Sequence, residues 1–265
     1  MQNEEVRKDI QRYIQIAVIV ILCAFTALLD VVNISFSKEE FYNRMICKIL
    51  QQACGSGAGI LLLLRLDIHL FAKPQNWLYL LPCLLVAVDN FQFSAYFSGK
   101  MKLVRTQPQD FILFFAYCML VGLFEETVFR GVVFSVLASL FGKDRKGLLW
   151  TFVLSSLVFG VAHLFNGSLL QAGYTILTGG LFAFCLLKTK NILCCAFVHG
   201  TFNFCGLLFD VQGLGDGVVF DLGTIITMAV VSVAVGVFVL YKVWTYSDDE
   251  RQELYRRLGL KLEKI

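Results

Sequence analysis

Charged side chains are scarce in this chain of 265 residues: Asp, Glu, Lys and Arg make up 16% of it, whereas 57% is hydrophobic. So few charges exclude an ordinary soluble domain, in which about a quarter of the residues are charged. Stretches of about 20 apolar residues, the length that crosses a bilayer core of about 30 Å, recur along nearly the whole sequence. The sequence therefore predicts an all-α, polytopic membrane bundle that forms a single membrane domain over residues 1–265.

Three further absences narrow the possible functions. The net charge of +3 is too small to indicate a nucleic-acid partner, so we expect none. The nine cysteines show neither a metal-ligand spacing nor an even-numbered disulfide framework, so we interpret them as small core residues. The first apolar run follows Arg7, Lys8 and Arg12 and has no small-residue cleavage site after it, which predicts a retained first span rather than a signal peptide.

Apolar segments predict about eight transmembrane helices. They cover residues 13–29, 45–64, 77–97, 111–141, 147–165, 169–187, 192–209 and 218–241. In the second segment, Gly55 and Gly59 form a face of small residues that is suited to close helix packing. A charged amphipathic tail follows the last segment and opens with a capping-box pattern at Ser247 and Glu250. We expect this tail to be solvated or to lie on the membrane surface.

The distribution of basic residues predicts the orientation in the membrane. With eight spans, the amino terminus, the tail and the loops after the second, fourth and sixth spans lie on one side, and they hold most of the Lys and Arg residues. Because basic residues concentrate in cytoplasmic segments, both termini are predicted to be cytoplasmic. The expected location is a bacterial cell membrane, with the lipid bilayer and a membrane-associated substrate as partners.

Two adjacent carboxylates and an arginine interrupt the fourth apolar segment, in Glu125-Glu126-Thr-Val-Phe-Arg130. Ionisable groups at membrane depth cost roughly 2.5 to 3.5 kcal/mol each, so an unpaired one indicates a function. Glu126 and Arg130 are four residues apart and share one helix face, where they can form an ion pair. Glu125 points about 100° away and has no such partner. We interpret Glu126 and Arg130 as structural and Glu125 as the reactive carboxylate.

The chain has three histidines, and two of them, His163 and His199, lie inside predicted spans at depths that Glu125 can reach. Phe159 shares a helix face with His163, as Asn203 does with His199. Hydrolysis of an amide needs a base for the water, donors for the oxyanion and an acid for the leaving nitrogen. Glu125 and His163 can hold and activate the water. His199 and Asn203 can then bind the oxyanion.

These residues resemble the CPBP family, which comprises the CAAX prenyl endopeptidases and the Abi-type, bacteriocin-processing membrane proteins. Its motifs Glu-Glu-x-x-x-Arg, Phe-x-x-x-His and His-x-x-x-Asn match residues 125–130, 159–163 and 199–203. The resemblance covers about residues 111–209. It implies an eight-span intramembrane endopeptidase in which the first glutamate and first histidine activate water, while the second histidine and the asparagine stabilise the oxyanion. It implies no preference for prenylated substrates.

Two alternatives remain. Glu125, His163 and His199 could instead bind catalytic zinc. Because His-Glu-x-x-His is absent and the Asn203 amide is a poor zinc ligand, we favour a mechanism without a cofactor.

The other alternative is a non-catalytic scaffold or transporter, such as a bacteriocin self-immunity partner, although a transporter usually shows internal repeats and none is seen. A Gly-x-Gly-Asp sequence at 213–216 resembles aspartyl intramembrane proteases, but these are ordinary turn residues in a short polar loop.

Overall fold

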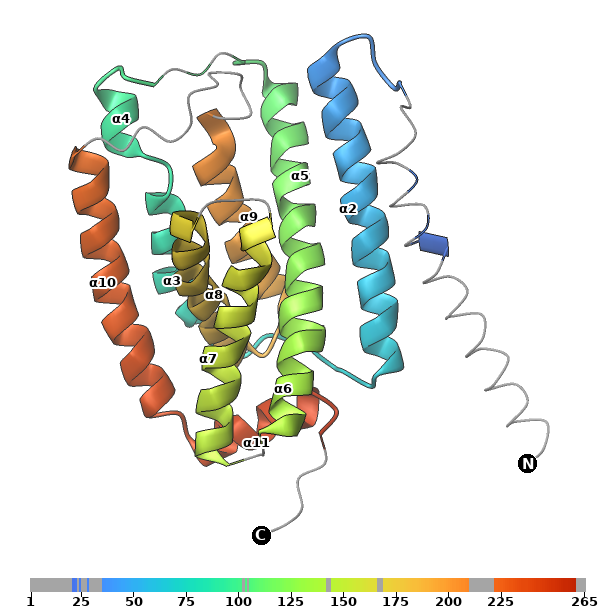
Figure 1. The fold of residues 1–265 in the computed structure, drawn as a ribbon, viewed down its shortest axis with the longest axis vertical. Coiled ribbons are helices and arrows are strands. Elements are labelled where there is room, and N and C mark those ends of the chain that lie inside the picture. Colours follow the sequence, from blue (N-terminus) through green and yellow to red (C-terminus); the bar gives the residue numbers. More distant parts are fainter. Residues whose placement is uncertain are drawn as a thin grey trace, which may run out of the picture.

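A computed structural model describes residues 35–101, 103, 105–141, 144–165, 169–209 and 222–260, together with 21, 22, 24 and 28. These residues form helices and no strand, which confirms the all-α prediction. The helices, drawn in Figure 1, are α2 (Glu40–Arg65), α3 (Leu80–Asp89), α4 (Phe93–Phe97), α5 (Pro108–Glu126), α6 (Phe134–Leu140), α7 (Arg145–Ala162), α8 (Leu169–Thr189), α9 (Ile192–Phe209), α10 (Leu222–Trp244) and α11 (Asp248–Arg257). Short 3₁₀ turns, η1 (Trp77–Tyr79) and η3 (His163–Phe165), precede α3 and follow α7.

Among the described residues, five helices are long and apolar enough to cross a membrane: α2, the continuous rod Pro108–Leu140, α7, α8 from Ala172 onward, and α10. The helical stretches Trp77–Asp89 and Ile192–Leu208 are apolar but shorter. The predicted first span at 13–29 lies largely outside the described residues. A helical membrane bundle is therefore confirmed, whereas the count of about eight spans is not.

The third predicted span is divided rather than continuous. The helix α3 ends at Asp89, and Gln92 adopts a left-handed conformation with φ of 61° before α4 begins. A side chain in this conformation cannot continue a right-handed helix, so the chain changes direction there. The prediction of one helix over 77–97 is therefore wrong.

The helix α8 is the central element, because every residue from 181 to 192 is buried. The helix α7 packs on α8, while α5 packs between α2 and α9 (Figure 1). A Cβ atom at Gly122 of α5 would lie 2.6 Å from the Ala196 carbonyl oxygen, and one at Gly200 of α9 would lie 2.9 Å from Met119 Cα. Only glycine permits this backbone approach, which brings the end of α5 against the middle of α9.

The expected packing face of α2 is confirmed. A Cβ atom at Gly55 would lie 2.8 Å from the Phe124 ring, and one at Gly59 would lie 2.7 Å from the Thr127 methyl group. Both glycines are buried. The small residues of α2 therefore support the part of α5 that carries the two glutamates, as close packing through small residues does in membranes.

Directly after Glu126 the helix widens into a π-helical segment, η2 (Thr127–Val133). Extra residues inserted into a helix in this way are frequent at functional sites. Ser135 Oγ donates to the Gly131 carbonyl, which helps to satisfy the widened backbone. The sequence predicted one regular helix here, because no residue in this stretch distinguishes a π-turn from an α-turn.

The carboxyl-terminal helix α11 packs on the bundle. Its capping box between Ser247 and Glu250 is present. Its apolar face is buried, at Leu254, Tyr255 and Leu258. The Arg257 guanidinium donates to the Lys190 carbonyl in the turn between α8 and α9, at 3.0 Å, and the His69 amide donates to the Arg257 carbonyl. The sequence did not predict this packing, in which the apolar face of the tail has a partner within the protein.

Candidate active site

Glu125 lies near the end of α5, with its carboxylate facing two imidazole rings. Glu125 Oε2 is 3.7 Å from His163 Nε2 and 3.8 Å from His199 Nε2. Both distances exceed a hydrogen bond, and this buried oxygen has no hydrogen-bond partner among the described residues. Separations of this size leave room for a bridging water. The Glu125 and His163 side chains are 24% and 25% exposed, so the site can be reached from outside the bundle.

His163 lies in η3, where α7 ends. Its Nδ1 is 2.7 Å from the Phe159 carbonyl oxygen, one turn earlier. Because a carbonyl only accepts, Nδ1 carries the proton and donates it. In the neutral ring, Nε2 therefore keeps its lone pair and directs it toward Glu125. This arrangement suits a group that accepts a hydrogen bond from water.

His199 is held from three sides. Its Nδ1 donates to Glu126 Oε1 at 2.8 Å, and the ring is 4% exposed. Phe182 of α8 stacks on the imidazole, with ring centroids 4.5 Å apart and planes 16° apart. Phe159 of α7 meets it edge-on at 5.7 Å. These contacts leave only Nε2 of His199 facing Glu125.

Glu126 and Arg130 form the predicted ion pair, with Arg130 Nε 3.1 Å from Glu126 Oε2 and both side chains fully buried. Arg130 also donates to the Gly179 carbonyl of α8 at 3.0 Å, and its guanidinium lies 4.8 Å from the Phe159 ring centroid. Glu126 thus connects a buried cation to His199. The sequence predicted the ion pair but not the contact between Glu126 and His199.

Asn203 lies one turn beyond His199 on α9 and is half-buried. Within the described part of the chain its amide makes no hydrogen bond, so its donors are available. The structure thus brings Glu125, His163 and His199 together at one point. Phe159 packs behind the two histidines, and Asn203 stands one turn away. Phe182 and Gly179 lie outside the three motifs, so the sequence did not reveal them.

The metal hypothesis can be compared with these distances. Neighbouring ligand atoms on a tetrahedral zinc ion are about 3.3 Å apart, whereas Glu125 Oε2 lies 3.7 and 3.8 Å from the two imidazole nitrogens. Over the residues that the structure describes, no group of three His, Cys, Asp or Glu side chains has the spacing of a metal site. The zinc alternative stays a prediction, which chelation tests.

Part of the chain matches a known protein family. Residues 107–205 match the family described as type II CAAX prenyl endopeptidase, Rce1-like. The resemblance is confirmed over this segment. The Rce1-like segment runs from the start of α5 into α9 and contains all the predicted site residues, whereas α2, α10 and α11 lie outside it. No curated protein and no solved structure matches the chain. Its apolar helices indicate an integral membrane protein, and residues 107–205 are similar to type II CAAX prenyl endopeptidases.

Proposed function

We propose that this protein is an intramembrane endopeptidase that hydrolyses a peptide bond of a membrane-associated protein or peptide. One observation carries the proposal: a buried carboxylate oxygen of Glu125 lacks a hydrogen-bond partner among the described residues and faces the Nε2 atoms of His163 and His199. An unsatisfied ionisable group at membrane depth is costly unless it is used. The Rce1-like match supports a peptidase.

In the first step, Glu125 acts as the general base. A water held between Glu125 Oε2 and His163 Nε2 gives one proton to the carboxylate while its oxygen attacks the carbonyl carbon. The carbonyl π-electrons move to oxygen and form a tetrahedral oxyanion. Glu125 then passes the proton to the leaving nitrogen as the C–N bond breaks. His163 Nε2 orients the water, because Nδ1 of the same ring is fixed on the Phe159 carbonyl.

His199 and Asn203 stabilise the oxyanion. With Nδ1–H fixed on Glu126, a protonated His199 directs its Nε2–H toward the reacting carbonyl. The Asn203 amide, one turn along α9, supplies the second donor. Donors that are held in place before the reaction stabilise the developing charge without reorganisation. Arg130 stabilises the carboxylate that holds His199, so the ion pair positions the donor rather than contacting substrate.

The decisive experiment compares membranes that contain wild-type protein, Glu125→Gln or Asp249→Asn. Asp249 is exposed in α11, so its variant makes the same change of charge far from the site. We expect peptidomic analysis to detect new cleavage products with the wild type and with Asp249→Asn, and none with Glu125→Gln. Products that persist with Glu125→Gln would disprove the mechanism, and equal peptide pools in all three samples would disprove the peptidase function.

A further inference from the structure

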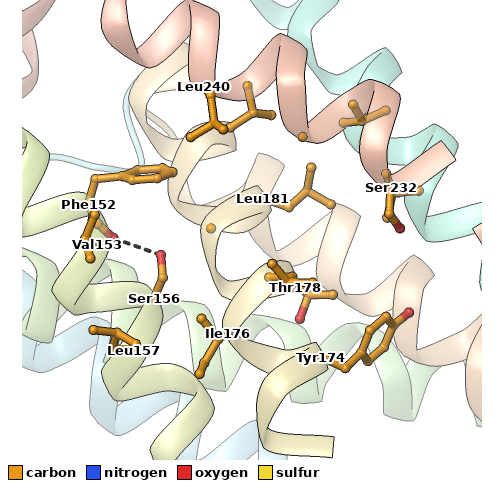
Figure 2. A pocket seen from close by; sticks show the side chains of 16 residues that line it. Phe152, Val153, Ser156, Leu157, Tyr174, Ile176, Thr178, Leu181, Ser232 and Leu240 are labelled. Carbon is orange, nitrogen blue, oxygen red and sulfur yellow. Dashed lines mark hydrogen bonds between the residues drawn. The ribbon is translucent and has the colours of Figure 1, made fainter. Parts of the chain in front are cut away.

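A cavity of about 300 Å³ lies between α7, α8 and α10, away from the candidate active site. Figure 2 shows side chains from the three helices surrounding it, with Phe152 from α7, Leu181 from α8 and Leu240 from α10. Its volume is at the lower end of the range for ligand pockets, about 300–1,000 Å³. The match to Rce1-like proteins does not reach α10, which forms one wall.

The lining of the cavity offers few polar groups to a ligand. The hydroxyls of Ser156 and Thr178 donate to backbone carbonyls of their own helices, at 2.8 and 3.3 Å. The Tyr174 hydroxyl donates to Asn90 at 3.0 Å. Most other lining side chains are aliphatic or aromatic. Ser232 supplies the remaining hydroxyl of the lining. A cavity with so few polar groups favours a hydrocarbon over a polar molecule.

The rim of the cavity faces the bilayer. Val153, Leu157, Leu177 and Leu240 line it and are also exposed on the outside of the bundle. They belong to three helices that are long and apolar enough to span a membrane. Lipid chains therefore surround the opening of the cavity. Because the rim is apolar, a lipid chain can enter without contacting a polar group.

A cation lies beyond the cavity, toward the start of α7 and the end of α10. The Arg145 guanidinium at the start of α7 lies 4.9 Å from the Trp244 ring centroid at the end of α10. Arg145 precedes Phe152 by seven residues, about 10 Å along the helix. Tryptophan is typical of the membrane interface, and Trp244 and Trp150 are both exposed. A lipid whose chain fills the cavity would have its phosphate at the depth of Arg145, where opposite charges attract.

We propose that this cavity binds one acyl chain of an anionic membrane phospholipid, with the lipid phosphate at Arg145. The site is formed by α7, α8 and α10 and does not use the peptidase residues. It therefore exists whether or not the protein cleaves peptides.

Gly236 provides the sharpest test. It lines the cavity, and a Cβ atom added there meets no atom within 4 Å, so Gly236→Phe can fill the space without displacing the backbone. The matched control is Val237→Phe, because Val237 is the next residue of α10, is 64% exposed and does not line the cavity. Gly236→Leu is a smaller substitution that keeps the test available if the phenylalanine variant fails to fold.

The measurement uses full-length protein in nanodiscs with phosphatidylglycerol that carries a photoreactive diazirine in one acyl chain. We expect wild type and Val237→Phe to be labelled within 152–157 and 232–240. Labelling of Gly236→Phe should fall on the order of tenfold, the effect of losing about 1.4 kcal/mol of binding. Equal labelling of Gly236→Phe and Val237→Phe, or labels spread evenly over all lipid-facing helices, would overturn the proposal.

The headgroup is tested with the same probe on phosphatidylcholine. Wild type should be labelled several times more strongly by phosphatidylglycerol, and Arg145→Gln should lose this preference while labels remain in the cavity. A preference unchanged in Arg145→Gln would overturn the phosphate site. Displacement of the probe by an equimolar prenylated peptide, but not by unlabelled phosphatidylglycerol, would overturn the assignment to phospholipid and identify a substrate chain instead.

Discussion

The two sides of α8 differ in polarity: one contacts buried charged groups, and the other lines a mostly apolar cavity. On one side, Gly179 and Phe182 contact Arg130 and His199, and the buried Arg130 and Glu126 charges compensate each other. On the other side lies a mostly apolar cavity, in which the hydroxyls of Ser156, Thr178 and Tyr174 bond to their own helices or to Asn90. Buried charges are retained only where partners exist. Glu125 differs from this ion pair, because its buried carboxylate oxygen faces two imidazoles and makes no hydrogen bond among the described residues.

The largest expected effect is on stability at the charged side. Arg130→Gln leaves the Glu126 carboxylate buried without its cation, which should lower the free energy of unfolding by about 3 to 5 kcal/mol. On the apolar side, Ser156→Ala should cost no more than about 1 kcal/mol, since its hydroxyl bonds only within its helix. Denaturant unfolding in one detergent measures both. Equal losses would contradict the difference between the two sides of α8.

Removing the oxyanion donor should affect turnover rather than folding. Asn203→Ala is expected to lower kcat on the order of 100- to 1,000-fold with little change in KM, because the donor acts mainly in the transition state. Its unfolding temperature should stay near that of the wild type, since its amide has no hydrogen bond within the described residues. Peptide cleavage in proteoliposomes gives both constants. Wild-type kcat in Asn203→Ala would remove this residue from the mechanism.

Chelation separates the glutamate mechanism from the zinc alternative. If Glu125 activates water directly, activity should survive dialysis against a chelator, and elemental analysis should find substoichiometric zinc. If zinc is bound by Glu125, His163 and His199, chelation should abolish activity and zinc or cobalt should restore it. In that case His163→Ala would also lose the metal, and the roles proposed for these three residues would be wrong.

The smallest expected effect lies at the partly exposed ion pairs of α11, which contrast with the buried pair in α5. Hydrogen bonds from Arg256, and then from Arg257, lower the pKa of Glu253 from 4.5 to about 2. A carboxylate with a lowered pKa adds stability above pH 4.5, and this contribution is lost as the pH falls toward 2. Glu253→Gln should therefore flatten the dependence of unfolding temperature on pH between 5 and 3. The change should be slight, because solvent screens exposed pairs.

Several features could be predicted from the sequence because they depend on neighbours in the chain. Apolar segment lengths predicted helices over most of the described residues, and spacing of four placed Glu126 beside Arg130. The break at Gln92 and the π-helical segment after Glu126 were missed, since both depend on backbone conformations that packing selects. The motifs indicated which residues could carry chemistry, yet they contain neither Phe182 nor Gly179.

By itself, the sequence determined the all-α membrane class, the residue types of the candidate site and the match to the Rce1-like family, because composition, periodicity and motif order are properties of the chain. Only the tertiary structure decided that Glu126 holds His199, 73 positions away, and that the apolar face of α11 is buried. It also decided that three helices enclose an apolar cavity. These contacts join distant segments, and they depend on close backbone approaches at glycines such as Gly122 and Gly200, whose partners the sequence does not specify.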